Sequence, residues 1–147
     1  QKEKIKNKLT LNKNQMMFFS HIKEYKFIEG FTKQNIILNK TEKYFLMTGI
    51  ANSEPLINHL DSEKINFSHF KFADHHFFQK RELTNLIKKA LKENVHYLII
   101  TEKDFYRLSK SNLSLLRSHF KLFYTQIAFD FIHDEKRMFH KQILKFI

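Results

Sequence analysis

Residues 44–55 read Tyr-Phe-Leu-Met-Thr-Gly-Ile-Ala-Asn-Ser-Glu-Pro, and this stretch decides the fold class. The apolar run Tyr44–Thr48 predicts a strand that is buried on both faces of a sheet. Gly49 begins a short turn. Ser53 and Pro55 then predict a helix start, because Ser can cap free N–H groups and Pro lacks an N–H that the first turn would leave unpaired. A buried strand followed by a helix is the repeating unit of a parallel α/β sheet.

The same pattern continues towards the end of the chain. Further strands are expected at Phe67–Phe72, Val95–Thr101 and Leu122–Ile132. Helices are expected between these strands, and a last amphipathic helix at Glu135–Ile147. The helix after Phe78 carries an apolar stripe that predicts its core face, formed by Leu83, Leu86, Ile87, Ala90 and Leu91. The alternation predicts an α/β fold with a mainly parallel sheet flanked by helices and joined by right-handed crossovers.

The segment ahead of this alternation has a different pattern. Gln1–Leu11 is polar and predicts a short helix or an extended lead-in. A further short strand is expected at Asn35–Leu38. Met16–Ile22 and Tyr25–Ile28 are two apolar stretches that predict a β-hairpin. We therefore expect a lead-in helix and β-hairpin linker over residues 1–43, and an α/β domain over residues 44–147.

The composition excludes several classes of site. The 147 residues contain no Cys, which rules out disulfides, thiolate metal sites and a cysteine nucleophile within them. With only 2 Gly, neither the phosphate-binding P-loop pattern nor the G-x-G-x-x-G dinucleotide pattern occurs. The formal net charge of +11 favours partners that carry phosphate, whether nucleic acid, anionic lipid or nucleotide.

Asp74-His75-His76 follows a predicted strand end, where ligands bind in open α/β sheets. A carboxylate beside an imidazole can fix its tautomer and raise its basicity. The residues alone leave several roles open: a general acid or base, a pair of metal ligands, a phosphate contact, or a plain histidine-rich loop in a chain with 9 His.

Thr101-Glu102-Lys103-Asp104 also follows a predicted strand end. Its spacing fits a capping box, which explains Thr101 and Asp104 as helix-start residues without any chemistry. The functional alternative is that Lys103 or Arg107 meets a phosphate group beside the helix N-terminus.

Three stretches together resemble one family, the tetraacyldisaccharide 4'-kinases. Thr48–Asn52, followed by Pro55, resembles the family's TGIA-N-P segment. Phe72–Phe77 resembles its F-[PA]-D-H-H-x-[FY] segment. Ile100–Asp104, with Arg107 in place, resembles its T-T-E-K-D-x-x-[KR] segment. The order and spacing agree from about residue 9 to the end, and an upstream F-F-S-x-I stretch is also similar.

The resemblance implies a kinase that moves the γ-phosphate of ATP to the 4'-hydroxyl of a tetraacyldisaccharide 1-phosphate, a lipid A precursor. It implies a P-loop α/β core joined by a β-hairpin to a smaller α/β domain. It also implies a place at the cytoplasmic face of the inner membrane in Gram-negative bacteria. The partners would then be the lipid precursor, ATP and an anionic membrane surface, with no specific nucleic acid.

The resemblance also assigns roles to particular residues. His75, with Asp74 beside it, would be catalytic and would tune an aspartate supplied from outside these 147 residues. The residues that would bind substrate or nucleotide are His76, Glu102, Lys103 and Arg107. ATP and Mg²⁺ would serve the full-length enzyme. The P-loop, the Mg²⁺-binding acidic segment and the catalytic aspartate do not occur here, so we expect no metal or nucleotide on this chain and no kinase activity from it alone.

Two other functions are compatible with parts of this sequence. In a DHH-type metallophosphoesterase, Asp74, His75 and His76 would bind Mn²⁺, but the further acidic and histidine ligands of such enzymes are missing. A basic nucleic-acid-binding module without catalysis would use aromatic side chains to stack on bases. Against that reading, aromatic residues such as Phe45, Phe67 and Phe105 fall at positions with core spacing.

Overall fold

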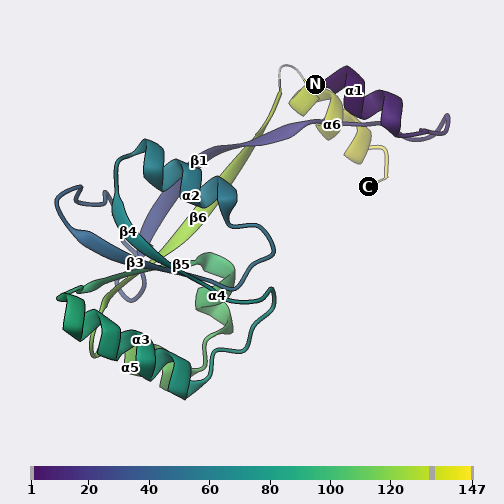
Figure 1. The fold of residues 1–147 in the computed structure, drawn as a ribbon. Helices are drawn as coiled ribbons and strands as arrows, with labels where there is room; N and C mark the ends of the chain where they lie inside the picture. Colours follow the sequence, from purple (N-terminus) through teal and green to yellow (C-terminus); the bar gives the residue numbers. More distant parts are fainter. Residues whose placement is uncertain (1, 133–134, 147) are drawn as a thin grey trace. The chain divides into compact units, whose positions relative to one another are not determined.

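The computed structural model describes residues 2–132 and 135–146. Within them, six strands form one sheet in the order β2-β1-β6-β5-β3-β4 (Figure 1). The strands are β1 Ser20–Glu29, β2 Asn35–Ile36, β3 Lys43–Thr48, β4 Asn66–Lys71, β5 Tyr97–Thr101 and β6 Lys121–Phe131. The helices are α1 Lys2–Lys8, α2 Glu54–Ser62, α3 Lys80–Glu93, α4 Glu102–Arg107, α5 Lys110–Arg117 and α6 Glu135–Ile143.

The central part of the sheet is parallel. β3 pairs with β4 on one side and with β5 on the other, so that Tyr44 lies opposite both Phe67 and Tyr97. β5 continues the parallel pairing to β6. β3 is the most enclosed strand, with Phe45, Leu46 and Met47 fully buried, because helices cover both faces of the sheet. The predicted α/β fold class is confirmed.

Two apolar cores lie on opposite faces of the sheet. One face packs against α3 and α5, the other against α2 (Figure 1). The first core includes Phe45, Met47, Leu83, Leu98, Ile100 and Leu116. The second includes Tyr44, Leu46, Leu56, Leu60, Ile99 and Phe123. The alternation of β3 residues between the two lists follows from the period-2 geometry of a strand.

The position predicted for the hairpin was wrong. β1 runs without a break through the residues where a turn was expected, since nothing at Lys23 favours a turn and its side chain is exposed as on a strand surface. The hairpin comes one step later, between β1 and the antiparallel strand β2. Its turn is stabilised by the Glu29 carboxylate, which accepts hydrogen bonds from the backbone N–H groups of Phe31 and Thr32.

Two helix details also differ from expectation. Leu91 is 66% exposed, whereas the other four stripe residues of α3 are buried. It lies about 80° around the helix from Leu83, which places it at the edge of the apolar face. Ser53 occupies the cap position of α2 but makes no side-chain cap hydrogen bond. The side chain of Asn52 takes this role and accepts from the Glu54 N–H at 3.0 Å.

The chain divides into two compact units. One is formed by described residues of Gln1–Glu24 and Ile127–Ile147, the other by Tyr25–Gln126. In the first unit, the ring of Phe139 lies 5.4 Å from that of Phe18 and 4.8 Å from that of Phe131. Among the described residues, no helix is long and apolar enough to cross a membrane. The division expected at residue 43 stays a prediction.

Candidate active site at the carboxyl ends of the strands

The loop after β4, residues 72–78, is tied to the end of β3; we call it the His75 loop. The Phe72 N–H donates to the Thr48 carbonyl at 2.7 Å, and the His75 N–H donates to the Gly49 carbonyl at 3.2 Å. Because β3 and β4 are parallel, both strands end at the same edge of the sheet. The first two resemblance segments therefore meet in space, although about 20 residues separate them.

Asp74 and His75 stand at the exposed end of this loop. The side chain of His75 is 70% exposed, and that of Asp74 is 38% exposed. One Asp74 carboxylate oxygen accepts the His75 N–H at 3.0 Å, and the other lies 3.6 Å from His75 Nε2. The ammonium group of Lys103, from α4, lies 3.7 Å from the same carboxylate. The structure thus brings an acid, an imidazole and an amine from two motifs into one exposed cluster.

His75 has a backbone φ of 58°, in the left-handed region. This conformation is uncommon for residues other than Gly, although His adopts it more often than most. The exposed imidazole of His75 is therefore carried by a backbone in an uncommon conformation, which is hydrogen-bonded to Gly49.

His76 points back into the fold. Its Nε2 lies 2.8 Å from the Glu82 carboxylate, and its ring stacks on Phe72 with centroids 4.9 Å apart. The Gln79 N–H also donates to Glu82 at 2.8 Å. Partial burial alone would raise the pKa of Glu82, but these two hydrogen bonds outweigh it and lower the pKa below the usual value. The imidazole of His76 is held as part of the loop's internal packing.

Asp104 lies at the centre of the site, with no exposed surface. Its carboxylate accepts the Gly49 N–H at 2.9 Å and the Thr101 hydroxyl at 2.7 Å. The Asp104 N–H in turn donates to the Thr101 oxygen, as in a capping box. The expected helix-start role is present. In addition, the carboxylate reaches across to the β3 turn, which joins the third resemblance segment to the first.

Arg107 lies against this carboxylate, 3.3 Å from Asp104. One guanidinium nitrogen donates to the Gly49 carbonyl at 3.2 Å, and the other donates to the His76 carbonyl at 2.7 Å. Its side chain is 19% exposed. Glu102 also has a partner inside the fold, because its carboxylate accepts from the Gln126 amide at 2.7 Å.

The candidate residues therefore fall into two groups. Asp74, His75 and Lys103 form the exposed cluster. The remaining three, His76, Glu102 and Arg107, make hydrogen bonds within the fold. Sequence reasoning missed the contact between Asp104 and Gly49. A signal for it exists, since Gly49 is one of only two glycines and a Cβ there would stand 3.1 Å from an Asp104 carboxylate oxygen.

The same residues bear on the two rival readings. Within residues 2–132 and 135–146, no group of three or more His, Asp or Glu side chains could hold a metal ion. Phe45 and Phe105 are buried in the core, so these two rings are not available to stack on bases.

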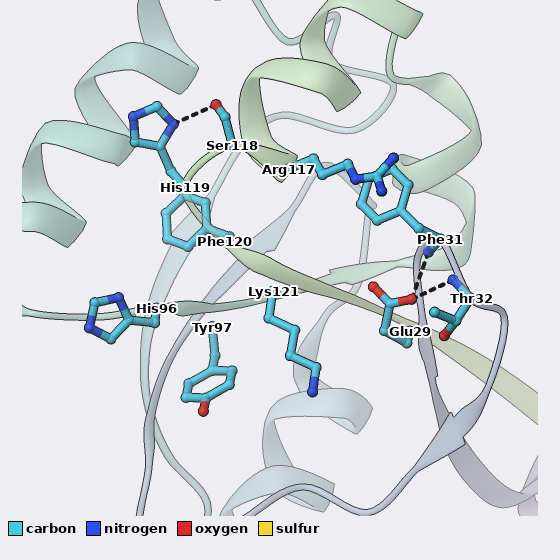
Figure 2. A pocket seen from close by; sticks show the side chains of 10 residues that line it. All are labelled: Glu29, Phe31, Thr32, His96, Tyr97, Arg117, Ser118, His119, Phe120 and Lys121. Carbon is cyan, nitrogen blue, oxygen red and sulfur yellow. Dashed lines mark hydrogen bonds between the residues drawn. The ribbon is translucent and has the colours of Figure 1, made fainter.

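A hollow of about 520 Å³ lies near the amino ends of β5 and β6 (Figure 2). We call it the amino-end depression. It is lined by Glu29, Phe31, Thr32, His96, Tyr97, Arg117, Ser118, His119, Phe120 and Lys121. The guanidinium of Arg117 lies over the ring of Phe31, 4.4 Å from its centroid. None of the residues of the three resemblance segments lines this hollow.

Comparison with known proteins gives one consistent result. A relative from Flavobacterium psychrophilum is 34% identical over 137 residues, which cover 92% of this chain and 37% of the relative. One from Flavobacterium johnsoniae is 34% identical over 97% of this chain and 39% of the relative. One from Pelagibacter ubique is 31% identical over 71% of this chain and 31% of the relative. Each is named tetraacyldisaccharide 4'-kinase.

The chain thus spans less than two fifths of the length of these curated relatives. No solved structure matches it significantly. The family of tetraacyldisaccharide-1-P 4'-kinases matches over residues 1–147. With the three motifs joined at one edge of the sheet, the chain belongs to the tetraacyldisaccharide-1-P 4'-kinase family.

Proposed function

We propose that this chain serves as the acceptor-side part of an ATP-dependent lipid kinase, which phosphorylates the 4'-hydroxyl of tetraacyldisaccharide 1-phosphate in lipid A biosynthesis. The observation that carries the proposal is the exposed cluster of Asp74, His75 and Lys103 at the carboxyl ends of the strands, in a chain whose relatives carry that enzyme name. Ligands bind at this edge in open α/β sheets.

In this proposal His75 acts on the proton of the acceptor hydroxyl through an aspartate that lies outside the 147 residues. Asp74 orients the imidazole, because its carboxylate contacts both the backbone N–H and the ring of His75. Lys103 adds a positive charge beside them, suited to a phosphate of the nucleotide or the lipid. Glu102 stands next to Lys103 and helps to fix the start of α4 through Gln126.

The ATP-phosphate cradle and the Mg²⁺ ligands would come from the remainder of a longer polypeptide. Phosphoryl transfer depends on positioning and on neutralising the charge of the transferred group, and those parts supply most of both. We therefore infer that the chain alone does not transfer phosphate. The direct test is incubation of the 147-residue chain with labelled ATP and tetraacyldisaccharide 1-phosphate, where any labelled lipid would contradict the proposal.

The proposed partners also include an anionic membrane surface at the cytoplasmic face of the inner membrane. Support comes from the net charge of +11 and from the last helix. None of the described residues of α6 is fully buried, and Met138, Ile143 and Leu144 are exposed on or just after it. Basic residues such as Arg137 and Lys141 accompany them. Apolar and basic side chains together suit binding to anionic headgroups.

The role of His75 is tested in the complete polypeptide that carries this segment. His75→Ala should lower kcat by about a hundredfold, the low end of the range for a group in proton transfer, with little change in KM. His119→Ala is the matched control, because His119 is an exposed histidine that lines the amino-end depression. Circular dichroism would check that both variants fold. An unchanged kcat for His75→Ala would remove His75 from the mechanism.

A further inference from the structure

We propose that Asp104 and Arg107 are positioning residues, which clamp the backbone on both sides of His75 to the turn at Gly49. Through these contacts Asp104 and Arg107 fix the position of the His75 imidazole. The inference rests on the proposed function of His75, and it changes the role expected for Arg107 from a phosphate contact to a support.

The clamp begins at Gly49, where both backbone groups are bound. The N–H of Gly49 donates to the Asp104 carboxylate at 2.9 Å. The carbonyl of Gly49 accepts two hydrogen bonds, one from the Arg107 guanidinium and one from the His75 N–H, both at 3.2 Å. Arg107 and the His75 N–H therefore bind the same atom, the carbonyl oxygen of Gly49.

The second contact lies on the other side of His75. The remaining terminal nitrogen of Arg107 donates to the His76 carbonyl at 2.7 Å. One planar guanidinium thus spans the Gly49 turn and the His75 loop. A lysine ammonium is a single compact charge and would not reproduce this fork.

The charged groups of the clamp are paired within the fold. Asp104 is fully buried, and its charge is compensated by Arg107, by the Thr101 hydroxyl and by the Gly49 N–H. One terminal nitrogen of Arg107 already serves both Gly49 and Asp104. The side chains of Asp104 and Arg107 are therefore less accessible to a ligand than that of Lys103, which is 50% exposed.

The backbone conformation of His75 is the feature that the clamp would stabilise. Its left-handed φ of 58° is a conformation that residues with a Cβ adopt less readily than glycine. Without the restraint on either side, the loop would relax towards ordinary backbone conformations, and the imidazole would leave its place beside Asp74.

The first test uses the 147-residue chain and needs no kinase activity. Amide hydrogen exchange followed by NMR is compared for wild type, Arg107→Gln, Arg107→Lys and the control Arg81→Gln, on an exposed position of α3. Arg107→Gln should speed exchange at Gly49 and His75 at least tenfold and leave the Leu86 amide in α3 unchanged. Arg107→Lys should give a smaller increase, and it keeps a positive charge beside Asp104 should the glutamine variant fail to fold.

Two outcomes would overturn the clamp: no change at Gly49 and His75, or an equal increase at every amide, which reports only a loss of global stability. The second test measures kinetics of the complete polypeptide. Arg107→Gln should lower kcat at least tenfold at nearly constant KM for ATP and lipid, with partial recovery in Arg107→Lys. A raised KM with unchanged exchange would instead make Arg107 a substrate contact.

The two tests separate the inference from the function on which it rests. If the wild-type polypeptide transfers no phosphate to the lipid, the proposed function fails, while the exchange data still decide whether the clamp exists.

Discussion

The two ends of the parallel strands use buried polar groups in different ways. At the carboxyl ends, the Asp104 carboxylate has no exposed surface and bonds to atoms of two other segments. At the amino ends, the Glu29 carboxylate lines the 520 Å³ depression and bonds to the next turn of its own chain (Figure 2). The first arrangement joins segments 55 residues apart, and the second closes a local turn.

The two ends also differ in what their carboxylates hold. At the amino ends, the carboxylate that lines the depression accepts hydrogen bonds from the N–H groups of Phe31 and Thr32. At the carboxyl ends the chemistry-bearing side chains protrude on a loop, and the buried polar groups lie beneath it as supports. Active sites of α/β proteins are commonly built in this way, from loops held by a rigid sheet.

The largest effect is expected at Asp104. Asp104→Ala removes a buried charge and leaves Arg107 and the Gly49 N–H without their partner, so the free energy of unfolding should fall by about 3 kcal/mol. Urea denaturation of the chain at pH 7 measures it. Asp61→Ala, on the exposed side of α2, is the control and should change stability by less than about 0.5 kcal/mol. A loss below about 1 kcal/mol for Asp104→Ala would mean that Asp104 at the carboxyl ends stabilises the fold no more than Glu29 does at the amino ends.

A smaller effect is expected at Glu29. Burial alone would raise its pKa, but the hydrogen bonds from Thr32 and Phe31 and the charge of Lys121 lower it below 4.5. Since the folded pKa lies below the unfolded one, this stabilisation is present above about pH 4.5 and is lost as the pH falls through the folded value. Glu29→Gln should therefore cost about 1 kcal/mol at pH 7.

The stability difference between wild type and Glu29→Gln, measured at low pH, is the control for this prediction. Urea denaturation of wild type and Glu29→Gln should show a gap that narrows once the pH is below the folded pKa of Glu29. A gap that stays constant at every acidic pH at which both proteins still fold would place the effect in side-chain packing rather than in the charge.

The smallest effect is expected at His69, which bonds to Thr48 at 2.8 Å near the end of β3. Burial, together with the charge of Lys71, lowers the pKa of this imidazole below 6.5. The unfolded chain then takes up the proton first as the pH falls, so wild type should lose stability below about pH 6.5. His69→Gln should show a shallower loss between pH 7 and 5.5, read from urea midpoints. Parallel pH profiles for the two proteins would contradict this.

Much of the fold could be predicted from local patterns. The unbroken apolar run of β3 and the spacing of Leu83, Leu86 and Ile87 on α3 report burial directly, because strand and helix periods decide which side chains share a face. The hairpin could not be placed in the same way. Its turn starts at Gly30, a typical turn residue, but its position also depends on Glu29, which accepts hydrogen bonds from the N–H groups of Phe31 and Thr32.

The sequence by itself determined the order of strands and helices from β3 onward, the family motifs, and the identity of Asp74 and His75 as candidates, since these depend on residue type and short spacing. Only the tertiary structure decided which motif residues face solvent and which make hydrogen bonds within the fold. His76 and Arg107 have the same residue types as ligand-binding groups, but their side chains bond within the fold. The partner of His76 is local, whereas Arg107 also reaches carbonyl groups 31 and 58 residues away. These two long-range contacts depend on the parallel register of β3, β4 and β5, which no local pattern encodes.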